Sequence, residues 1–279
     1  MLDPESGVRK DAAVWVASVG AVRRALLTVL PKAALSWCTG AVTRCPLPRG
    51  LRAPLYGWFA RRYGAVLSDV DKELVEFGTL AEFFARPLRD GARPLARAAD
   101  LVWPCDGKVV SAGPFTAGKL VQVKGSDYSL QELLGDTSLA SALANGSQAT
   151  IYLAPGDYHR VHAPFSGQLG QLTRMRGKLF PVNPPAVQSI PRLFARNARV
   201  VFPFALDDGR AAAVVMVAAL NVGDIQASAK AGEHLEIGQE LGRFGFGSTV
   251  VALVAAGGQS FPMVPPETVV RQGAGCTPT

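Results

Sequence analysis

The sequence predicts an α+β protein in which a helical N-terminal arm precedes a mostly antiparallel β domain. Of its 279 residues, 48% are hydrophobic and 18% are charged, so the chain can bury a large core. Residues 1–65 combine apolar and basic side chains, whereas residues 66–279 contain short β-like runs separated by Gly, Pro and Asp. We therefore expect a helical arm over residues 1–65 and a β-rich domain over residues 66–279.

The arm carries the positive charge of the protein. Between Ala12 and Ala65 there are eight basic residues and no acidic one, so this segment contributes +8 and leaves −1 for the rest of a chain whose net charge is +7. The basic residues are Arg23, Arg24, Lys32, Arg44, Arg49, Arg52, Arg61 and Arg62.

The apolar residues of the arm indicate contact with a membrane surface. The apolar run before Arg23 has 11 residues, fewer than the roughly 20 that span a bilayer. Basic residues interleaved with Trp and aliphatic side chains are typical of a helix that lies in an anionic membrane interface. Nucleic-acid binding, a helical layer packed on the core, and a signal peptide without a clear cleavage site are the alternatives. Pro46, Pro48 and Pro54 divide the arm into short helices.

Short motifs predict the remaining elements. In "TLAEFFARPL", Thr79 is a helix N-cap with Glu82 three residues later, and this helix ends before Pro87. A second helical segment is expected at "SLQELLG", inserted among the strands. Several runs of β-branched residues predict the strands, among them "ATIYLAP", "ARVVFPFAL", "AAAVVMVAALNVGDI" and "STVVALVAAG". No fixed-period repeat is present.

Two of the three histidines lie together in "LAPGDYHRVHAPFSG", as His159 and His162. Each could be a structural histidine, and the pair could bind a metal or perform acid–base chemistry. No third ligand stands at a recognisable spacing, and neither Cys105 nor His234 belongs to a metal-binding motif, so no metal is expected. The four cysteines form no CxxC pair, which fits a reducing compartment.

Asp106 and Ser248 could complete a catalytic set with these histidines. Asp106 in "PCDGKVV" and Ser248 in "FGFGSTVV" are each explained by a turn. An Asp, a His and a Ser are also the parts of a nucleophile, base and orienting group. Ser248 could then attack an external ester or the carbonyl of Gly247. The absence of a Gly-x-Ser-x-Gly elbow around Ser248 argues against an ordinary hydrolase.

The motifs taken together resemble the phosphatidylserine decarboxylase proenzymes, a pyruvoyl-dependent family. The resemblance extends from Thr79 to Gly257 and rests on many short pieces in one order. They are "TLAEFFARPLRDGARPL", "WPCDGKVV", "VKGSDYSLQELLG", "YLAPGDYHRVHAPFSG", "LFPVNPPAV", "LFARNARVV", "VAALNVGDI" and "GQELGRFGFGST". The arm is similar to the membrane-associating helices of the longer bacterial members.

The resemblance implies the roles of the site residues. His162, oriented by Asp106, would deprotonate Ser248 for attack on Gly247. The chain would then divide between Gly247 and Ser248 into large (1–247) and small (248–279) subunits, and Ser248 would become a covalent pyruvoyl cofactor. His159 would protonate the substrate carbon after CO2 is lost.

The resemblance also implies the partners and the location. The substrate would be phosphatidylserine, the product phosphatidylethanolamine, the assembly a homodimer, and the location peripheral on the cytoplasmic side of the cell membrane, without nucleic acid. Cys105, Asp224 and the short segment from 225 to 238 depart from the family pattern, which bears on the substrate pocket. Another seryl lipid as the substrate, or an unprocessed lipid-binding β domain, are the alternative functions.

Overall fold

A computed structural model describes residues 40–97, 99–123, 126–219, 225–245 and 248–276. The helix expected around Arg23 lies outside the described residues. Among the described helices, none combines the length and the apolar composition needed to cross a membrane.

A nine-stranded sheet forms the centre of the molecule, and all of its strand pairs are antiparallel, as predicted. The strand order is β11-β6-β8-β9-β13-β4-β1-β14, with β7 paired to β8. The strands are β1 (Gly107–Phe115), β4 (Gly146–Leu153), β6 (Gly167–Leu169), β7 (Thr173–Met175), β8 (Arg199–Leu206), β9 (Ala211–Ala218), β11 (His234–Leu235), β13 (Ser248–Ala255) and β14 (Val269–Val270).

The centre of this sheet is buried on both faces. In β13, Val250 and Ala252 belong to one hydrophobic cluster, whereas Val251 and Leu253 belong to a second cluster on the other face. A strand covered on both faces needs apolar residues at every position, because successive side chains point to opposite sides. This burial explains why "STVVALVAAG" is a continuous apolar run and does not alternate.

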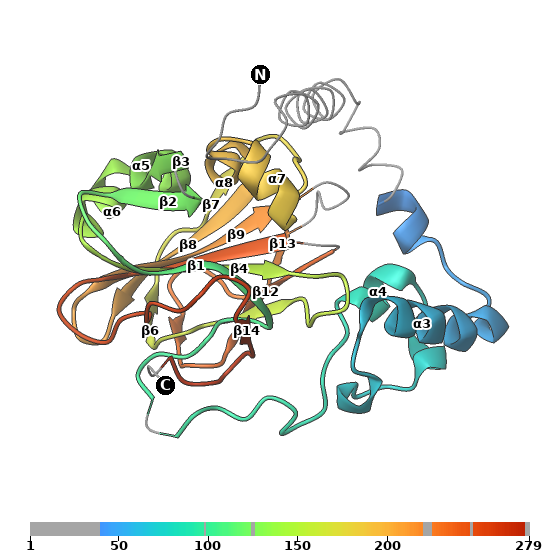
Figure 1. The fold of residues 1–279 in the computed structure, drawn as a ribbon. Coiled ribbons are helices and arrows are strands. Elements are labelled where there is room, and N and C mark those ends of the chain that lie inside the picture. The colour runs from blue at the N-terminus through green and yellow to red at the C-terminus, as the bar shows by residue number, and fades with distance from the viewer. Residues whose placement is uncertain (1–39, 98, 124–125, 220–224, 246–247, 277–279) are drawn as a thin grey trace, which may run out of the picture.

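Two layers cover the faces. A three-stranded antiparallel sheet, in the order β10-β12-β5, contributes Val161, Leu241 and Phe244 to the first cluster. Short helices contribute Leu133, Phe194 and others to the second, and Figure 1 shows α5, α7 and α8 gathered on one side of the large sheet. The elements are β5 (Arg160–His162), β10 (Ile225–Ala227), β12 (Glu240–Phe244), α5 (Leu130–Leu134), α6 (Thr137–Ala142), α7 (Pro184–Ser189), α8 (Leu193–Arg196) and the ribbon of β2 (Lys119–Val123) with β3 (Ser126–Ser129). The helix predicted at "SLQELLG" is α5.

A helical region lies beside the sheets in Figure 1 and has its own hydrophobic cluster. It comprises helical residues 40–44, α3 (Arg49–Tyr63), the 3₁₀ turns η1 (Leu67–Asp69) and η2 (Leu74–Glu76), and α4 (Leu80–Phe84). Pro46 and Pro48 separate the first two helical segments as expected, whereas Pro54 lies inside α3 without ending it.

The predicted N-cap of α4 is confirmed: the N–H of Glu82 donates to Thr79 Oγ1 at 3.1 Å. The Glu82 carboxylate accepts from the N–H of Gly78, one residue before the position that a capping box uses. Across residue 66, Tyr56 of α3 stacks on Phe83 of α4 with ring centroids 4.6 Å apart. The division at residue 66 stays a prediction, and the arm and the β domain share this aromatic contact.

Three adjacent strands of the large sheet connect directly to the three strands of the small one. β4 leads to β5 through residues 154–159, β9 leads to β10, and β12 leads to β13. The neighbours β9-β13-β4 and the neighbours β10-β12-β5 stand in the same order. All three connections therefore cross between the sheets at one edge, and we call this edge the seam.

Candidate active site

Ser248 is the first residue of β13, at the seam. It pairs with Leu153 of β4 on one side and with Ala218 of β9 on the other. Ser248 is fully buried, and its Oγ has no hydrogen-bond partner in the described structure. Oγ1 of Thr249 is also buried and without a partner. Gly247 lies outside the described residues.

His159 ends the β4–β5 connection and is fully buried. Its Nδ1 lies 2.9 Å from the carbonyl oxygen of Asp157. A carbonyl only accepts, so Nδ1 carries the proton and Nε2 holds the lone pair. Within the described residues, Nε2 has no partner. Burial lowers the pKa of His159 to about 3, so the ring is neutral at pH 7.

His162, in β5, has hydrogen-bond partners at both ring nitrogens. Nδ1 lies 2.8 Å from the carbonyl oxygen of Gly238 and therefore donates. Nε2 then accepts from the hydroxyl of Tyr158, 3.1 Å away. Burial lowers the pKa of His162 and raises that of Tyr158 to about 12, so both groups are neutral at pH 7.

Asp106 is not joined directly to His162. Its carboxylate accepts from Nε and Nη2 of Arg93, at 2.6 to 3.1 Å, and from the backbone N–H of Gln272 at 2.9 Å. The charge of Asp106 still favours protonation of His162. The resemblance implied that the Asp106 carboxylate orients the imidazole of His162. In the structure, the Gly238 carbonyl and the Tyr158 hydroxyl bind the two ring nitrogens instead.

Three of the buried groups that have no hydrogen-bond partner among the described residues lie at the seam and form the chemically distinctive part of the site. Burying a hydroxyl or imidazole nitrogen without a partner costs about 1–3 kcal/mol. At the seam, the side-chain polar atoms of Ser248 and Thr249 and Nε2 of His159 are buried in this way, without a partner among the described residues. A hydrogen bond to β12 and a short segment of chain connect His159 to Ser248. The N–H of Phe244, the last residue of β12, donates to the carbonyl of His159 at 3.0 Å. The chain then reaches Ser248 four residues later.

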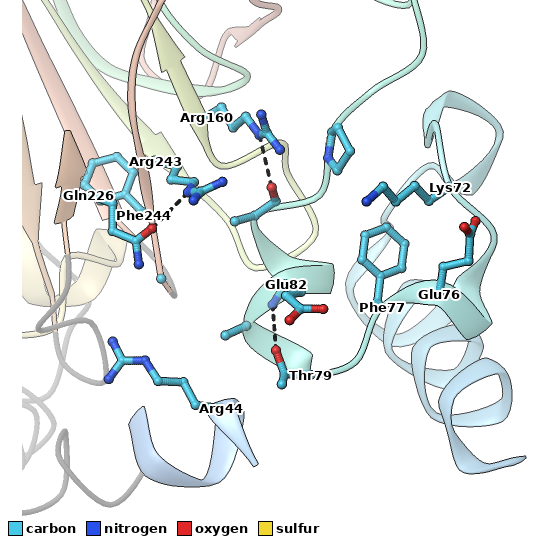
Figure 2. A pocket seen from close by; sticks show the side chains of 14 residues that line it. Arg44, Lys72, Glu76, Phe77, Thr79, Glu82, Arg160, Gln226, Arg243 and Phe244 are labelled. Atoms are coloured by element: carbon cyan, nitrogen blue, oxygen red, sulfur yellow. Dashed lines mark hydrogen bonds between the residues drawn. The ribbon is translucent and has the colours of Figure 1, made fainter. Parts of the chain in front are cut away.

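A cavity of about 480 Å³ lies beside the seam, between α4 and the three-stranded sheet. Figure 2 shows Arg160 and Arg243 on the sheet side and Lys72 on the opposite side. Gly245 is part of the lining. Gly245 stands three positions before Ser248, so their Cα atoms are at most about 11 Å apart. The full charged lining is Arg44, Lys72, Arg160, Arg243, Glu76 and Glu82.

The cavity suits an anionic polar ligand. Four cationic side chains outnumber the two carboxylates of its lining. Arg160 is paired with Glu240, at 2.8 Å, and Arg243 Nε donates to the amide oxygen of Gln226 at 3.0 Å.

Two arginines of the site escaped the sequence analysis. Arg93 binds Asp106, and Arg86 donates from Nη2 to the carbonyl of Gly156 at 2.7 Å. Both lie in "FFARPLRDGARPL", a segment interpreted as a helix end and as one piece of the family resemblance, without a role for either arginine. An arginine two residues after a pair of adjacent phenylalanines is the signal that could have identified Arg86.

No group of three or more His, Cys, Asp or Glu side chains suited to a metal ion occurs among the residues that the structure describes.

The family model described as phosphatidylserine decarboxylase matches residues 80–276. A "Phosphatidylserine decarboxylase proenzyme" of Anaeromyxobacter sp. (strain K) is 43% identical over 268 residues, covering 88% of this chain and 94% of the relative. A protein of the same name from Pseudomonas aeruginosa (strain PAO1) is 42% identical over 222 residues, with 71% and 76% covered. One from Alcanivorax borkumensis (strain SK2) is 38% identical over 267 residues, with 87% and 91% covered.

Proposed function

Because the chain belongs to the phosphatidylserine decarboxylase family, we propose that it cuts itself before Ser248 and then converts phosphatidylserine to phosphatidylethanolamine and CO2. The observation that supports this most strongly is a serine hydroxyl at the start of the central strand that is buried and has no hydrogen-bond partner among the described residues. A hydroxyl that served only a turn would form a local hydrogen bond.

In the proposed self-processing, a base removes the Ser248 hydroxyl proton while Oγ attacks the carbonyl carbon of Gly247. The peptide C–N bond breaks and an ester forms, with the proton transferred to the new amine. Elimination then releases the Gly247 carboxylate and leaves dehydroalanine at residue 248. Hydrolysis of that residue releases ammonia and leaves a pyruvoyl group. We assign the base to His162 and assign Asp106 to the electrostatic support of its protonated form.

The residues present fit such a group. Ser248 Oγ and His159 Nε2 are buried and have no hydrogen-bond partner among the described residues, as expected of polar groups that act on a reacting group. When formed, a pyruvoyl group supplies an electrophilic carbonyl for the substrate amine and accepts the electrons that CO2 leaves behind.

His159 is assigned the proton transfer to the substrate carbon. Its tautomer leaves Nε2 with a lone pair and with no partner among the described residues, and this nitrogen must gain a proton before it can donate one. Phe84 lies against its ring, with centroids 4.0 Å apart, and keeps this part of the site apolar.

We assign the phospholipid headgroup to the cationic cavity. Phosphatidylserine carries a phosphate close to its serine amine, so a site near residue 248 must accommodate that negative charge. Arg243, Lys72 and Arg44 line a cavity that opens next to Gly245 and supply positive charge there. The glycerol and acyl chains would extend toward the membrane.

The outer face of α3 is proposed to lie on an anionic membrane surface on the cytoplasmic side. Leu51 and Trp58, seven residues apart on this helix, are 57% and 53% exposed. Arg61 and Arg62 follow in its last turn. Exposed Trp and Leu next to arginines are typical of interfacial helices. A homodimer stays part of the proposal on the basis of the family resemblance.

The proposed function is tested by trapping the substrate on the small subunit. Purified protein is incubated with phosphatidylserine in detergent micelles and sodium cyanoborohydride, and CO2 release is followed in parallel without reductant. We expect a covalent mass increase on residues 248–279, and CO2 release that Ser248→Ala abolishes. Decarboxylation without an adduct on that segment, or undiminished activity of Ser248→Ala, would refute the proposal.

A further inference from the structure

Phe84, the last residue of α4, and the two residues after it each contact residues 156–160, the segment that carries His159. Phe84 packs on the imidazole of His159 with ring centroids 4.0 Å apart. The carbonyl of Ala85 accepts from Nε of Arg160 at 3.1 Å. Arg86 donates from Nη2 to the carbonyls of Gly156 and Asp157, at 2.7 and 3.3 Å. We call residues 84–86 the clamp.

Arg86 is unusual for an arginine because it is only 2% exposed. Its Nε and Nη1 have no hydrogen-bond partner in the described structure, which makes its burial costly. The negative charges of Asp106 and Asp157 offset part of that cost. A guanidinium retained at this cost, with a single nitrogen bonded to two adjacent carbonyls, indicates a role in holding those carbonyls.

The carbonyl of Asp157 links the guanidinium to the imidazole. It accepts from Arg86 Nη2 and from Nδ1 of His159, so two N–H donors converge on one oxygen. The side chain of Asp157 closes the same connection by accepting from the N–H of Ala154 at 2.7 Å. The orientation of this carbonyl therefore decides which nitrogen of His159 is protonated.

The C-terminal end of α3 also contacts residues 154–159 closely. A Cβ atom at Gly156 would lie 2.1 Å from the carbonyl oxygen of Tyr63, so glycine is required there for the close approach. The backbone of 154–159 is thus enclosed between the end of α3 and the clamp.

We propose that Arg86 is a positioning residue for decarboxylation, which fixes the Asp157 carbonyl so that His159 keeps Nδ1–H and presents Nε2 to the reacting carbon. This inference rests on the proposed role of His159 and adds a function for the helical region: α4 sets the geometry of the catalytic histidine. Arg86 is not part of the lining of the cationic cavity, so its effect should fall on kcat and not on KM.

The kinetic test compares Arg86→Met, Arg86→Lys and Arg89→Met with the wild type. Arg86→Met keeps the length of the side chain without its donors, and we expect self-cleavage, an unchanged KM and a loss in kcat on the order of 10²-fold, typical of a misplaced catalytic group. Arg86→Lys should recover part of kcat because it retains a charged donor. Arg89 is the matched control, since it also donates to a carbonyl, that of Val70, and does not touch the connection.

A second measurement tests the positioning role of Arg86 even if the Arg86→Met protein does not cleave itself. In the Ser248→Ala background, ring ¹⁵N chemical shifts report the tautomer of each of the three histidines, assigned with His→Gln variants. We expect an Nδ1–H tautomer for His159, and tautomer exchange when Arg86→Met is added. An unchanged His159 signal, or a wild-type kcat in Arg86→Met, would overturn the inference. Absence of cleavage in the wild type would instead refute the proposed function.

Discussion

At the scale of single residues, the site separates two histidines that look equivalent in the sequence. Both have Nδ1–H bonded to a backbone carbonyl, but Nε2 of His162 accepts from Tyr158 whereas Nε2 of His159 has no described partner. The sequence predicted that His159, His162, Asp106 and Ser248 belong to one site. The partners of each nitrogen could not be predicted, because they come from Gly238 and Asp157 backbone carbonyls whose directions depend on the tertiary fold.

This difference predicts two distinct histidine variants. His162→Ala should leave a single uncleaved chain, because the base for Ser248 is lost. His159→Ala should cleave and then decarboxylate with a loss on the order of 10²–10⁴-fold, as for a missing acid–base group. Gel mobility measures the first property and CO2 release the second. The opposite pattern would exchange the two roles, and wild-type behaviour of both variants would contradict them.

The burial of His159 also predicts sensitivity to acid. The pKa of His159 is about 3 in the folded protein and 6.5 for a solvent-exposed histidine, so between these values the unfolded chain binds the proton more readily. Its contribution to stability is complete above pH 6.5 and decreases as the pH falls toward 3, by about 2 kcal/mol at pH 5. Urea unfolding of Ser248→Ala at pH 7 and pH 5 measures this loss. Adding His159→Gln should reduce the loss by about 2 kcal/mol, and an equal loss with and without that substitution would contradict the assignment.

At the scale of elements, the helical region contacts the site, in addition to the membrane-facing role that the sequence predicted for it. Its charge and exposed apolar residues indicate a membrane-facing arm, and the N-cap at Thr79 was predicted correctly. The contacts of α4 with His159 and Arg160 could not be predicted, because they join residues about 75 positions apart. Local sequence patterns predict where a helix begins, but they do not predict which distant loop the helix contacts.

The surface of α3 predicts salt-dependent membrane binding. Removing residues 1–65 would also expose the aromatic cluster, since Tyr56 stacks on Phe83. Substitutions on the outer face avoid this problem. Arg61→Gln combined with Arg62→Gln should weaken binding to anionic vesicles by about 10- to 30-fold at low salt, because each surface cation contributes about 1 kcal/mol.

Vesicle sedimentation at two salt concentrations measures the effect, with Met263→Ser as the control for an exposed apolar residue, 78% accessible, on the β domain. High salt should reduce the difference between the double variant and the wild type. Binding that is unchanged by the double substitution would place the membrane contact elsewhere.

The cationic cavity predicts variants that bind substrate poorly but still mature. Arg243→Gln or Lys72→Gln should raise KM for phosphatidylserine by about 10-fold, the usual effect of removing one charged hydrogen bond. Self-cleavage should be complete in both. Arg192→Gln is the control, because Arg192 is a surface cation paired with Glu132 away from this cavity. An unchanged KM in both cavity variants would exclude the cavity as the headgroup site.

At the scale of the whole molecule, the seam explains why the reacting serine starts a strand. β13 is held by β4 and β9 on either side, while the chain before it belongs to a different sheet. The sequence predicted antiparallel strands and a helical insertion, because β-branched runs and turn residues are local signals. The matching order of three strands in two sheets could not be predicted, since strand order depends on contacts between distant segments. That order brings the connections before His159 and Ser248 to one edge.

The central claim is that the chain divides itself at Gly247–Ser248, and intact mass spectrometry of the freshly purified full-length protein tests it most directly. We predict two polypeptides, residues 1–247 and 248–279. The smaller one should carry a pyruvoyl group in place of Ser248, so that its N-terminus does not react with amine reagents. Ser248→Ala should give one chain of 279 residues under the same conditions. A single intact wild-type chain, or a small fragment with a free serine amine, would contradict the account.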